Sequence, residues 1–298
     1  MMADMRIRQC DGVLTIDDVT DFNLDHIFDC GQCFRWEKNP DGSYSGAAFG
    51  KVVTIDYEND CRQLKLYGSC EEDFDNIWRS YLDLDRDYGA VKRTLMERDT
   101  VIRDAIDYGQ GIRILNQEKW ETLISFIISQ NNNIPRIKKN INSLAELMGE
   151  RIGEYNGKTW YSLPSADVLA AAEVEDLAPC RLGYRARYLI ETARQVSTDG
   201  IESLEKLADP EMSAAQTVEA LRGYCGVGPK VANCIALFSM GRIDSFPIDT
   251  WVKKVMNQLY GIPENEMKRM AEFAKDAFGE YGGIAQQYLF YYITHRNE

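Results

Sequence analysis

Histidine is almost absent from this chain of 298 residues, which contains only His26 and His295. Two histidines far apart in the sequence argue against acid–base or metal chemistry that depends on imidazole. No apolar run reaches the roughly 18–20 residues that a membrane-spanning helix needs, and the opening "MMADMRIRQCDG" lacks the apolar region of a signal peptide. We therefore expect a protein that is neither inserted into a membrane nor secreted.

Positive charge is also scarce, since 34 Lys and Arg residues against 47 Asp and Glu residues give a formal net charge of −13. This balance argues against a general nucleic-acid binder, because neutralising phosphates requires lysine and arginine. The eight cysteines, without a secretory context, are expected to be reduced thiols. The C-x-x-C pair Cys30 and Cys33 has no second pair at the spacing of a zinc site, so we expect a structural role for it.

Strand-like sequence is concentrated near the N-terminus. Residues 31–67 contain a Pro-Asp-Gly turn between aromatic-rich runs, which is typical of a β-hairpin, followed by "KVVTIDY" and "RQLKLY". Helical periodicity dominates from residue 74 onwards. We predict an α+β fold with an N-terminal antiparallel β-sheet domain and flanking helices at 1–112, and a mostly α-helical part at 113–298.

Several of the predicted helices have clear bounds. The segments 91–109 and 165–178 each have the pattern of one helix. The run "EKWETLISFIISQ" is almost continuously apolar in its second half, so we expect it to form a central buried helix. It ends at "NNN", and Pro135 opens the next helix.

The segment "LRGYCGVGPKVANCIALF" at 221–238 places a Gly-Val-Gly turn between two helices. Gly226 and Gly228 permit positive φ and a close approach of backbones, and Pro229 suits the first helical position. The unpaired N–H groups at this helix start attract anions. The helix, hairpin and second helix therefore predict an element that holds a nucleic-acid phosphate without reading the base sequence.

Lys230 follows this turn, at a helix N-terminus where the dipole disfavours a positive charge. A lysine acts as a nucleophile where burial or positive potential favours its neutral amine, but from this segment alone a lysine extended into water is the commoner case. Asp249, two residues after Pro247, is expected to N-cap the next helix. If the two N-termini converge, Asp249 can stabilise positive charge on a sugar during cleavage of a glycosidic bond.

The Gly-Val-Gly-Pro-Lys hairpin followed by Pro-Ile-Asp resembles the helix-hairpin-helix superfamily of DNA glycosylases, which implies a helical glycosylase core after the sheet. The lysine resembles the bifunctional members, which remove a base and then nick the strand. Iron–sulfur members carry four cysteines after this region, whereas no cysteine follows Cys234, so we expect no cluster and no other cofactor. A structural monovalent or divalent cation at the hairpin is left open.

Five further motifs resemble the 8-oxoguanine DNA glycosylase family in order along the chain. They are "GQCFRW" at 31–36, "YLDLDRDY" at 81–88, "ISQNNNIPRI" at 128–137, "GYRARY" at 183–188 and "AQQYLF" at 285–290. The resemblance implies that Lys230 attacks C1′ of the sugar, expels the base and forms a Schiff base that leads to β-elimination, with electrostatic support from Asp249.

The same resemblance implies a pocket for a base that has been flipped out of the duplex. Cys234 and Phe290 would lie on its two faces, and Gln286 would bind its Watson–Crick edge. The carbonyl of Gly31 would accept the N7–H that 8-oxoguanine has and guanine lacks. Phe238 stands at a position that we associate with methionine, and would shape the pocket wall.

A further set of residues would contact DNA. Asn131 would fill the vacated space, Arg136 and Arg185 would bind the orphaned cytosine, and Tyr184 would wedge beside it. The basic residues expected near DNA are Arg136, Lys138, Lys139, Arg181, Arg185 and Arg187. The remaining DNA-binding candidates are Gly226, Gly228, Val231 and Trp251, of which Trp251 replaces a histidine found in many relatives.

Each of these residues also has an ordinary structural explanation, such as core packing for Cys234 and Phe290 or a solvated helix face for Arg185. Overall we expect a monomeric base-excision enzyme that acts on 8-oxoguanine opposite cytosine in double-stranded DNA, in the bacterial cytoplasm or a eukaryotic nucleus. One alternative is a glycosylase for another purine lesion that uses Asp249 and water without Lys230. Another is a non-catalytic helix-hairpin-helix module that binds DNA.

Overall fold

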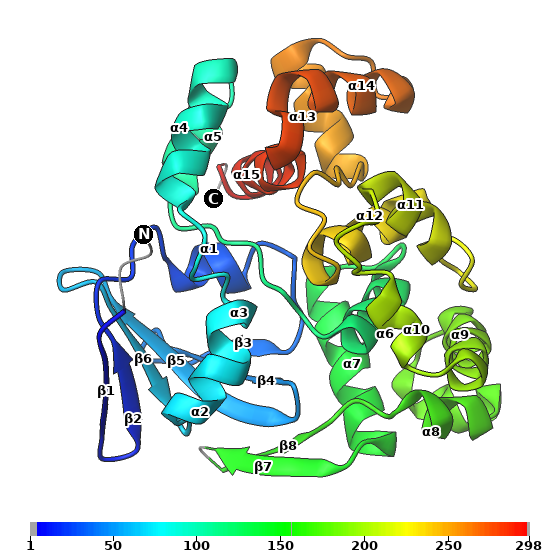
Figure 1. Ribbon diagram of the computed structural model, residues 1–298. Coiled ribbons are helices and arrows are strands. Elements are labelled where there is room, and N and C mark those ends of the chain that lie inside the picture. The colour runs from blue at the N-terminus through cyan, green and yellow to red at the C-terminus, as the bar shows by residue number, and fades with distance from the viewer. Residues whose placement is uncertain (1–4, 156, 297–298) are drawn as a thin grey trace.

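The computed structural model describes residues 5–155 and 157–296. Its N-terminal strands are β1 (Ile7–Cys10), β2 (Val13–Ile16), β3 (Trp36–Lys38), β4 (Tyr44–Ala48), β5 (Lys51–Glu58) and β6 (Gln63–Tyr67). They form one antiparallel six-stranded sheet in the order β1-β2-β6-β5-β4-β3 (Figure 1). The predicted antiparallel sheet is confirmed, and it also includes the β1–β2 hairpin, which lies before the strand-rich segment that the sequence indicates.

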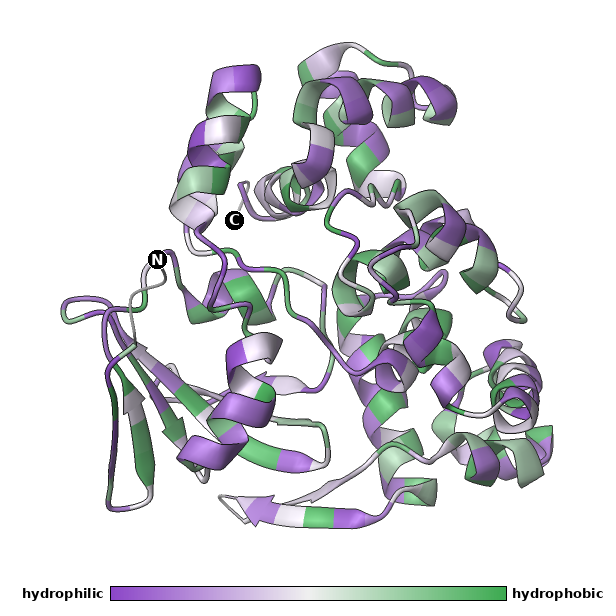
Figure 2. Ribbon diagram, in the orientation of Figure 1, coloured by the Kyte–Doolittle hydropathy of each residue, from purple (hydrophilic) through white to green (hydrophobic). Residues whose placement is uncertain are grey.

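Side chains alternate between the two faces of this sheet, as the period of a strand requires. In β6, Leu64 and Leu66 are buried and their neighbours are partly exposed, and hydrophobic and hydrophilic residues alternate along the strands in Figure 2. Gly46 in β4 lies opposite Trp36 in β3, where a Cβ would come within 2.3 Å of the indole. The loop that connects α1 (Leu24–Phe28) to the edge strand β3 lies on the side of the sheet that faces the helical part of the chain (Figure 1).

Helices form most of the chain beyond the sheet, as predicted. The short ones are α2 (Glu71–Asp73), α3 (Arg79–Tyr81), α5 (Arg103–Tyr108), α8 (Ala166–Ala171) and α10 (Glu202–Lys206), with the π-helical turn η1 (Phe74–Trp78) and the 3-10 turns η2 (Val174–Cys180) and η3 (Gly279–Tyr281). The longer ones are α4 (Tyr88–Arg98), α6 (Lys119–Ser129), α7 (Ile134–Met148), α9 (Arg185–Asp199), α11 (Ala214–Leu221), α12 (Pro229–Ser239), α13 (Thr250–Tyr260), α14 (Met267–Phe278) and α15 (Gly282–His295).

The larger hydrophobic core is built around α6, α12 and α15, and the prediction of a central buried helix is confirmed by α6. Helices α4 and α5 lie within the segment 1–112, but their buried side chains belong to this larger core and pack against α14 and α15. None of the helices in the described parts of the chain is long and apolar enough to cross a membrane.

Two local predictions are wrong, and one element was not predicted. The helix predicted at 91–109 is interrupted because Asp99 is extended and its carboxylate accepts a hydrogen bond from the Val101 N–H at 2.8 Å. The helix predicted at 165–178 is divided into α8 and the 3-10 turn η2. The part after residue 74 also contains a hairpin of β7 (Arg151–Tyr155) and β8 (Lys158–Tyr161), which packs against β5.

Candidate active site

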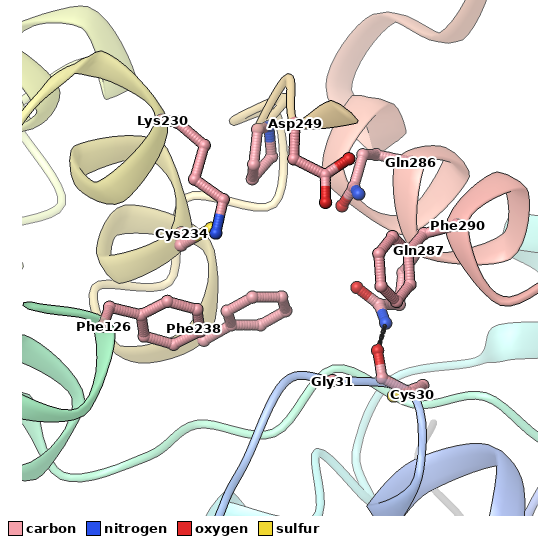
Figure 3. A pocket seen from close by; sticks show the side chains of 11 residues that line it. Cys30, Gly31, Phe126, Lys230, Cys234, Phe238, Asp249, Gln286, Gln287 and Phe290 are labelled. Carbon is pink, nitrogen blue, oxygen red and sulfur yellow. Dashed lines mark hydrogen bonds between the residues drawn. The ribbon is translucent and has the colours of Figure 1, made fainter. Parts of the chain in front are cut away.

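A cavity of about 60 Å³ lies between the loop after α1, the helices α6, α12 and α15, and the segment that leads into α13. All seven residues proposed from the sequence for catalysis or base binding line it (Figure 3). They are Gly31, Lys230, Cys234, Phe238, Asp249, Gln286 and Phe290. The cavity therefore unites residues that are up to 259 positions apart in the chain.

Lys230 is the second residue of α12, which begins at Pro229 after the N-cap Gly228. Its side chain is partly buried and points into the cavity, with the ammonium 5.4 Å from the centre of the Phe126 ring. Cys234 lies one turn further along the same helix, and burial raises the pKa of its thiol, which therefore forms an uncharged wall. The lysine extended into bulk water, which the isolated segment favoured, is not what the fold produces.

Asp249 enters the same cavity from the start of α13. Its Oδ1 accepts a hydrogen bond from the Val252 N–H at 2.7 Å, so the predicted N-cap is confirmed. The carboxylate and the Lys230 ammonium face the same space in Figure 3, although no ion pair within 4.0 Å joins these two described residues. Because Asp249 caps the helix through Oδ1 and also lines the cavity, its second carboxylate oxygen is available to a bound molecule.

Gly31 lines the cavity on the side that faces Lys230 and Asp249 (Figure 3), and its φ of +77° favours glycine. A Cβ at this position would lie 3.3 Å from the Phe290 ring, so glycine also leaves room for that side chain. The aromatic surface continues across the cavity, where Phe126 and Phe238 stack with their ring centres 5.5 Å apart. The pocket thus combines a flat apolar surface with the backbone of Gly31 and the side chains of Lys230 and Asp249.

Two consecutive glutamines of α15 complete the pocket. The Oε1 atom of Gln286 is buried and has no hydrogen-bond partner among the described residues, and the side chain lies beside Asp249 (Figure 3). Gln287, which the sequence analysis did not single out, donates from Nε2 to the Cys30 carbonyl at 2.5 Å. An unpaired buried acceptor is costly, so Gln286 is suited to a ligand that brings an N–H donor.

The hairpin between α11 and α12 has the predicted form. Gly226 has a φ of +77°, and a Cβ there would lie 2.5 Å from the ring of Tyr188. Gly228 has open space around the Cβ position, so its backbone can be approached closely. Val231 is 4% exposed, so its side chain belongs to the core, and its contribution to binding would come from its backbone N–H in the first turn of the helix. Thr192 of α9 anchors the hairpin by donating to the Cys225 carbonyl at 3.0 Å.

A second surface element lies at the loop between α6 and α7. Asn131 has a φ of +46° and donates to the hydroxyl of Tyr184, which is 49% exposed. Arg185 is buried, and its guanidinium donates to the carbonyls of Gln130, Asn131 and Leu182. The alternative that Arg185 lies on a solvated helix face is therefore wrong. In this structure its side chain supports the loop that presents Asn131.

Some of the basic residues expected near DNA are already engaged in contacts within the protein, and others are not. Lys138 donates to the Trp36 carbonyl at 3.1 Å, and Arg187 forms an ion pair of 2.6 Å with Glu191. Three exposed cations form no side-chain hydrogen bond, ion pair or ring contact with the described part of the chain: Arg136, Lys139 and Arg181. Trp251 is 43% exposed in the first turn of α13, with Lys254 over its ring.

All eight cysteines are free thiols, and Cys30 and Cys33 are buried in agreement with a structural role. Within residues 5–155 and 157–296 no group of three or more His, Cys, Asp or Glu side chains is arranged to hold a metal ion.

Comparisons with known proteins agree along the whole chain. Residues 15–123 match the N-terminal domain of 8-oxoguanine DNA glycosylase, and residues 124–278 match the HhH-GPD superfamily of base excision DNA repair proteins. The N-glycosylase/DNA lyase OGG1 of Arabidopsis thaliana is 32% identical over 299 residues, which cover 91% of this chain and 77% of that protein.

Two solved structures are similar over nearly every residue. One is the Clostridium acetobutylicum 8-oxoguanine glycosylase/lyase in complex with double-stranded DNA containing cytosine opposite 8-oxoguanine, with a TM-score of 0.93, 43% identity and coverage of 100% of both chains. The other is MBOgg1 in complex with a low-affinity DNA ligand, with a TM-score of 0.93, 42% identity and coverage of 99% of this chain and 100% of that one.

Proposed function

This chain belongs to the 8-oxoguanine DNA glycosylase family of the HhH-GPD superfamily, and we propose on that premise that it excises 8-oxoguanine from double-stranded DNA and then cleaves the strand. The observation that carries the proposal is that Lys230 and Asp249 face a single cavity, which is also lined by Gly31 and by Gln286 with its unpaired acceptor. A nucleophile, a carboxylate and groups able to recognise a base thus surround one space.

In the proposed reaction the neutral amine of Lys230 attacks C1′ of the flipped nucleotide. The N–C1′ bond forms while the C1′–N9 bond breaks, and the base leaves with the electron pair and takes up a proton. The nitrogen loses a proton, and its lone pair then forms the C1′=N bond of a protonated Schiff base while the C1′–O4′ bond breaks and O4′ takes up a proton. Loss of a C2′ proton then expels the 3′ phosphate. Asp249 stabilises the positive charge that develops at C1′ as the glycosidic bond breaks.

The base would be recognised by hydrogen bonds as well as by shape. Gln286 Oε1 would accept a hydrogen bond from the Watson–Crick edge, and the Gly31 carbonyl would accept the N7–H of 8-oxoguanine. Guanine would instead place its N7 acceptor against this carbonyl, and such a mismatch costs about 1–3 kcal/mol. Phe290 and Cys234 would cover the two faces of the ring, so the cavity favours a planar base with a donor at N7.

The surface around the cavity fits duplex DNA with cytosine opposite the lesion. Arg136 is exposed and would bind the orphaned cytosine. Asn131, in the loop after α6, and Tyr184, at the start of α9, are joined by a hydrogen bond and would fill the space that the flipped nucleotide leaves. The N–H groups at the start of α12 would hold a phosphate of the damaged strand. We further propose that the protein works as a monomer without a cofactor, and that it acts wherever the genome of its cell lies.

Incubation with an end-labelled duplex that contains 8-oxoguanine opposite cytosine tests this function. We expect free 8-oxoguanine, measured by mass spectrometry, together with strand cleavage, and we expect Lys230→Gln to abolish both. Base release by Lys230→Gln at the normal rate would favour the alternative route through Asp249 and water. Retained DNA binding by the wild type without any base release would favour a non-catalytic binding module.

A further inference from the structure

The loop that carries Gly31 is held in place by glutamine side chains from distant parts of the chain. Gln287 of α15 donates to the carbonyl of Cys30, and Gln117 donates to the carbonyl of Gln32 at 2.7 Å. The carbonyls before and after Gly31 are therefore both occupied. No hydrogen bond from the described residues reaches the Gly31 carbonyl itself, and Gly31 is one of the residues that line the cavity.

These hydrogen bonds lie where water cannot replace them. Cys30 and Gln287 are each 1% exposed, and Gln32 is fully buried. The Gln32 side chain is itself fixed, because it donates to the Arg113 carbonyl at 2.8 Å and accepts from the Leu115 N–H at 2.9 Å. A carbonyl that loses its donor at such a depth is left unpaired, which is unfavourable. The loop therefore depends on each donor to keep its conformation.

Glycine makes external support of this kind necessary. Gly31 has a φ of +77°, but a glycine adopts several other backbone conformations at little cost. The direction of its carbonyl is thus not determined by the residue itself. The orientation of the peptide unit between Cys30 and Gly31 depends on the φ of Gly31. Among the described residues, the one hydrogen bond to this peptide unit is the bond that Gln287 donates to the Cys30 carbonyl.

We propose that Gln287 is a positioning residue for recognition of the damaged base. By holding the Cys30 carbonyl, it fixes the direction in which the Gly31 carbonyl faces N7 of the base. Figure 3 shows Gln287 reaching from α15 across to this loop. The inference rests on the proposed function, and it adds a residue that does not itself need to contact the base in order to affect which base is removed.

A DNA substrate that lacks the base distinguishes a role of Gln287 in positioning the loop from a role in the general stability of the protein. Strand cleavage at a preformed abasic site involves Lys230 but no base, whereas release of 8-oxoguanine involves both. We expect Gln287→Met, which removes the donor at similar side-chain length, to slow single-turnover base release about fivefold, the factor for one hydrogen bond worth about 1 kcal/mol. Cleavage at the abasic site should be unchanged.

Gln287→Leu provides an independent variant, since it removes the N–H donor and carries no acidic proton that could donate in its place, and it should give the same split between the two reactions. Tyr288→Phe is the matched control. Tyr288 is the next residue of α15, is fully buried, and has a hydroxyl without a partner among the described residues. Removing that hydroxyl should leave both rates unchanged.

Wild-type rates of base release in both Gln287 variants would overturn the positioning role. An equal loss of base release and abasic-site cleavage in both variants would also overturn it, because that pattern indicates a general structural role. Failure of the wild type to release 8-oxoguanine is a different result, which refutes the proposed function and not merely the part assigned to Gln287.

Discussion

Replacing Gly31 by alanine tests how closely the cavity is fitted to a base. Alanine at a φ of +77° experiences a steric conflict of about 1–2 kcal/mol. Its Cβ would also lie 3.3 Å from one carbon of the Phe290 ring and 3.5 Å from the next. That contact is tight, so the ring has to shift by a few tenths of an ångström into the space proposed for the base.

Gly50→Ala is a control with the same backbone conflict. Gly50 lies between β4 and β5 with a φ of +71°, and nothing lies within 4 Å of its Cβ position. Urea unfolding should show a loss of about 1–2 kcal/mol for both variants. When the base is bound, the shifted Phe290 ring would crowd it, and crowding of a packed site costs about 1–3 kcal/mol. Single-turnover release of 8-oxoguanine should therefore slow at least about fivefold in Gly31→Ala but not in Gly50→Ala.

Two outcomes would refute this reasoning. Gly31→Ala could lose the expected stability and still release 8-oxoguanine at the wild-type rate, which would show that the wall of the cavity at Gly31 is not in contact with the base. Alternatively, Gly50→Ala could slow base release as much as Gly31→Ala, which would assign the effect to stability and not to the pocket.

Three further changes have distinct expected results. Asp249→Asn keeps an oxygen for the Val252 N–H, so urea unfolding should change by less than about 0.5 kcal/mol, while loss of the charge should slow base release about a hundredfold. Arg136→Ala should lower the preference for cytosine over adenine opposite the lesion about tenfold, measured as a ratio of single-turnover rates on two duplexes. Burial raises the pKa of Glu121 to about 7 from 4.5, beside Arg35. Because the unfolded chain loses this proton first, the contribution of Glu121 is fully present below pH 4.5 and is lost as pH rises to about 7. Urea unfolding of Glu121→Gln should lack this decline.

Each of these expectations has a contrary result. Unchanged base release in Asp249→Asn would remove the carboxylate from the reaction. An unchanged opposite-base preference in Arg136→Ala would assign cytosine recognition to another residue. The same decline of stability with pH in wild type and Glu121→Gln would mean that another group titrates over that interval.

The candidate residues of the cavity could be named from the sequence because their motifs occur in a fixed order. Cap and turn signals locate the helix starts at Lys230 and Asp249, and both starts are where they were predicted. Their convergence on one cavity is a tertiary property that no local pattern specifies. The resemblance to a family supplied it, and with it Gly31 and Gln286 on the opposite walls.

Other features depend on contacts between distant segments. Arg185 has the sequence context of an exposed helix residue, and it is buried because the end of α6 leaves the carbonyls of Gln130 and Asn131 without helical partners. Gln287 could have been noticed as a second amide in a largely apolar and mostly buried helix, where each amide needs a partner. The β7–β8 hairpin had a local signal as well, since the sequence carries Asn-Gly at positions 156 and 157.

Trapping with borohydride tests the central claim most directly. Reduction of a Schiff base converts it into a stable amine, so a wild-type reaction with an 8-oxoguanine:cytosine duplex should give a covalent protein–DNA adduct on a denaturing gel. Peptide mapping should locate the DNA on Lys230, and Lys230→Gln should give no adduct although it still binds the duplex. An adduct of equal yield in Lys230→Gln, or none in a wild-type protein that releases the base, would contradict the assignment of Lys230 as the nucleophile.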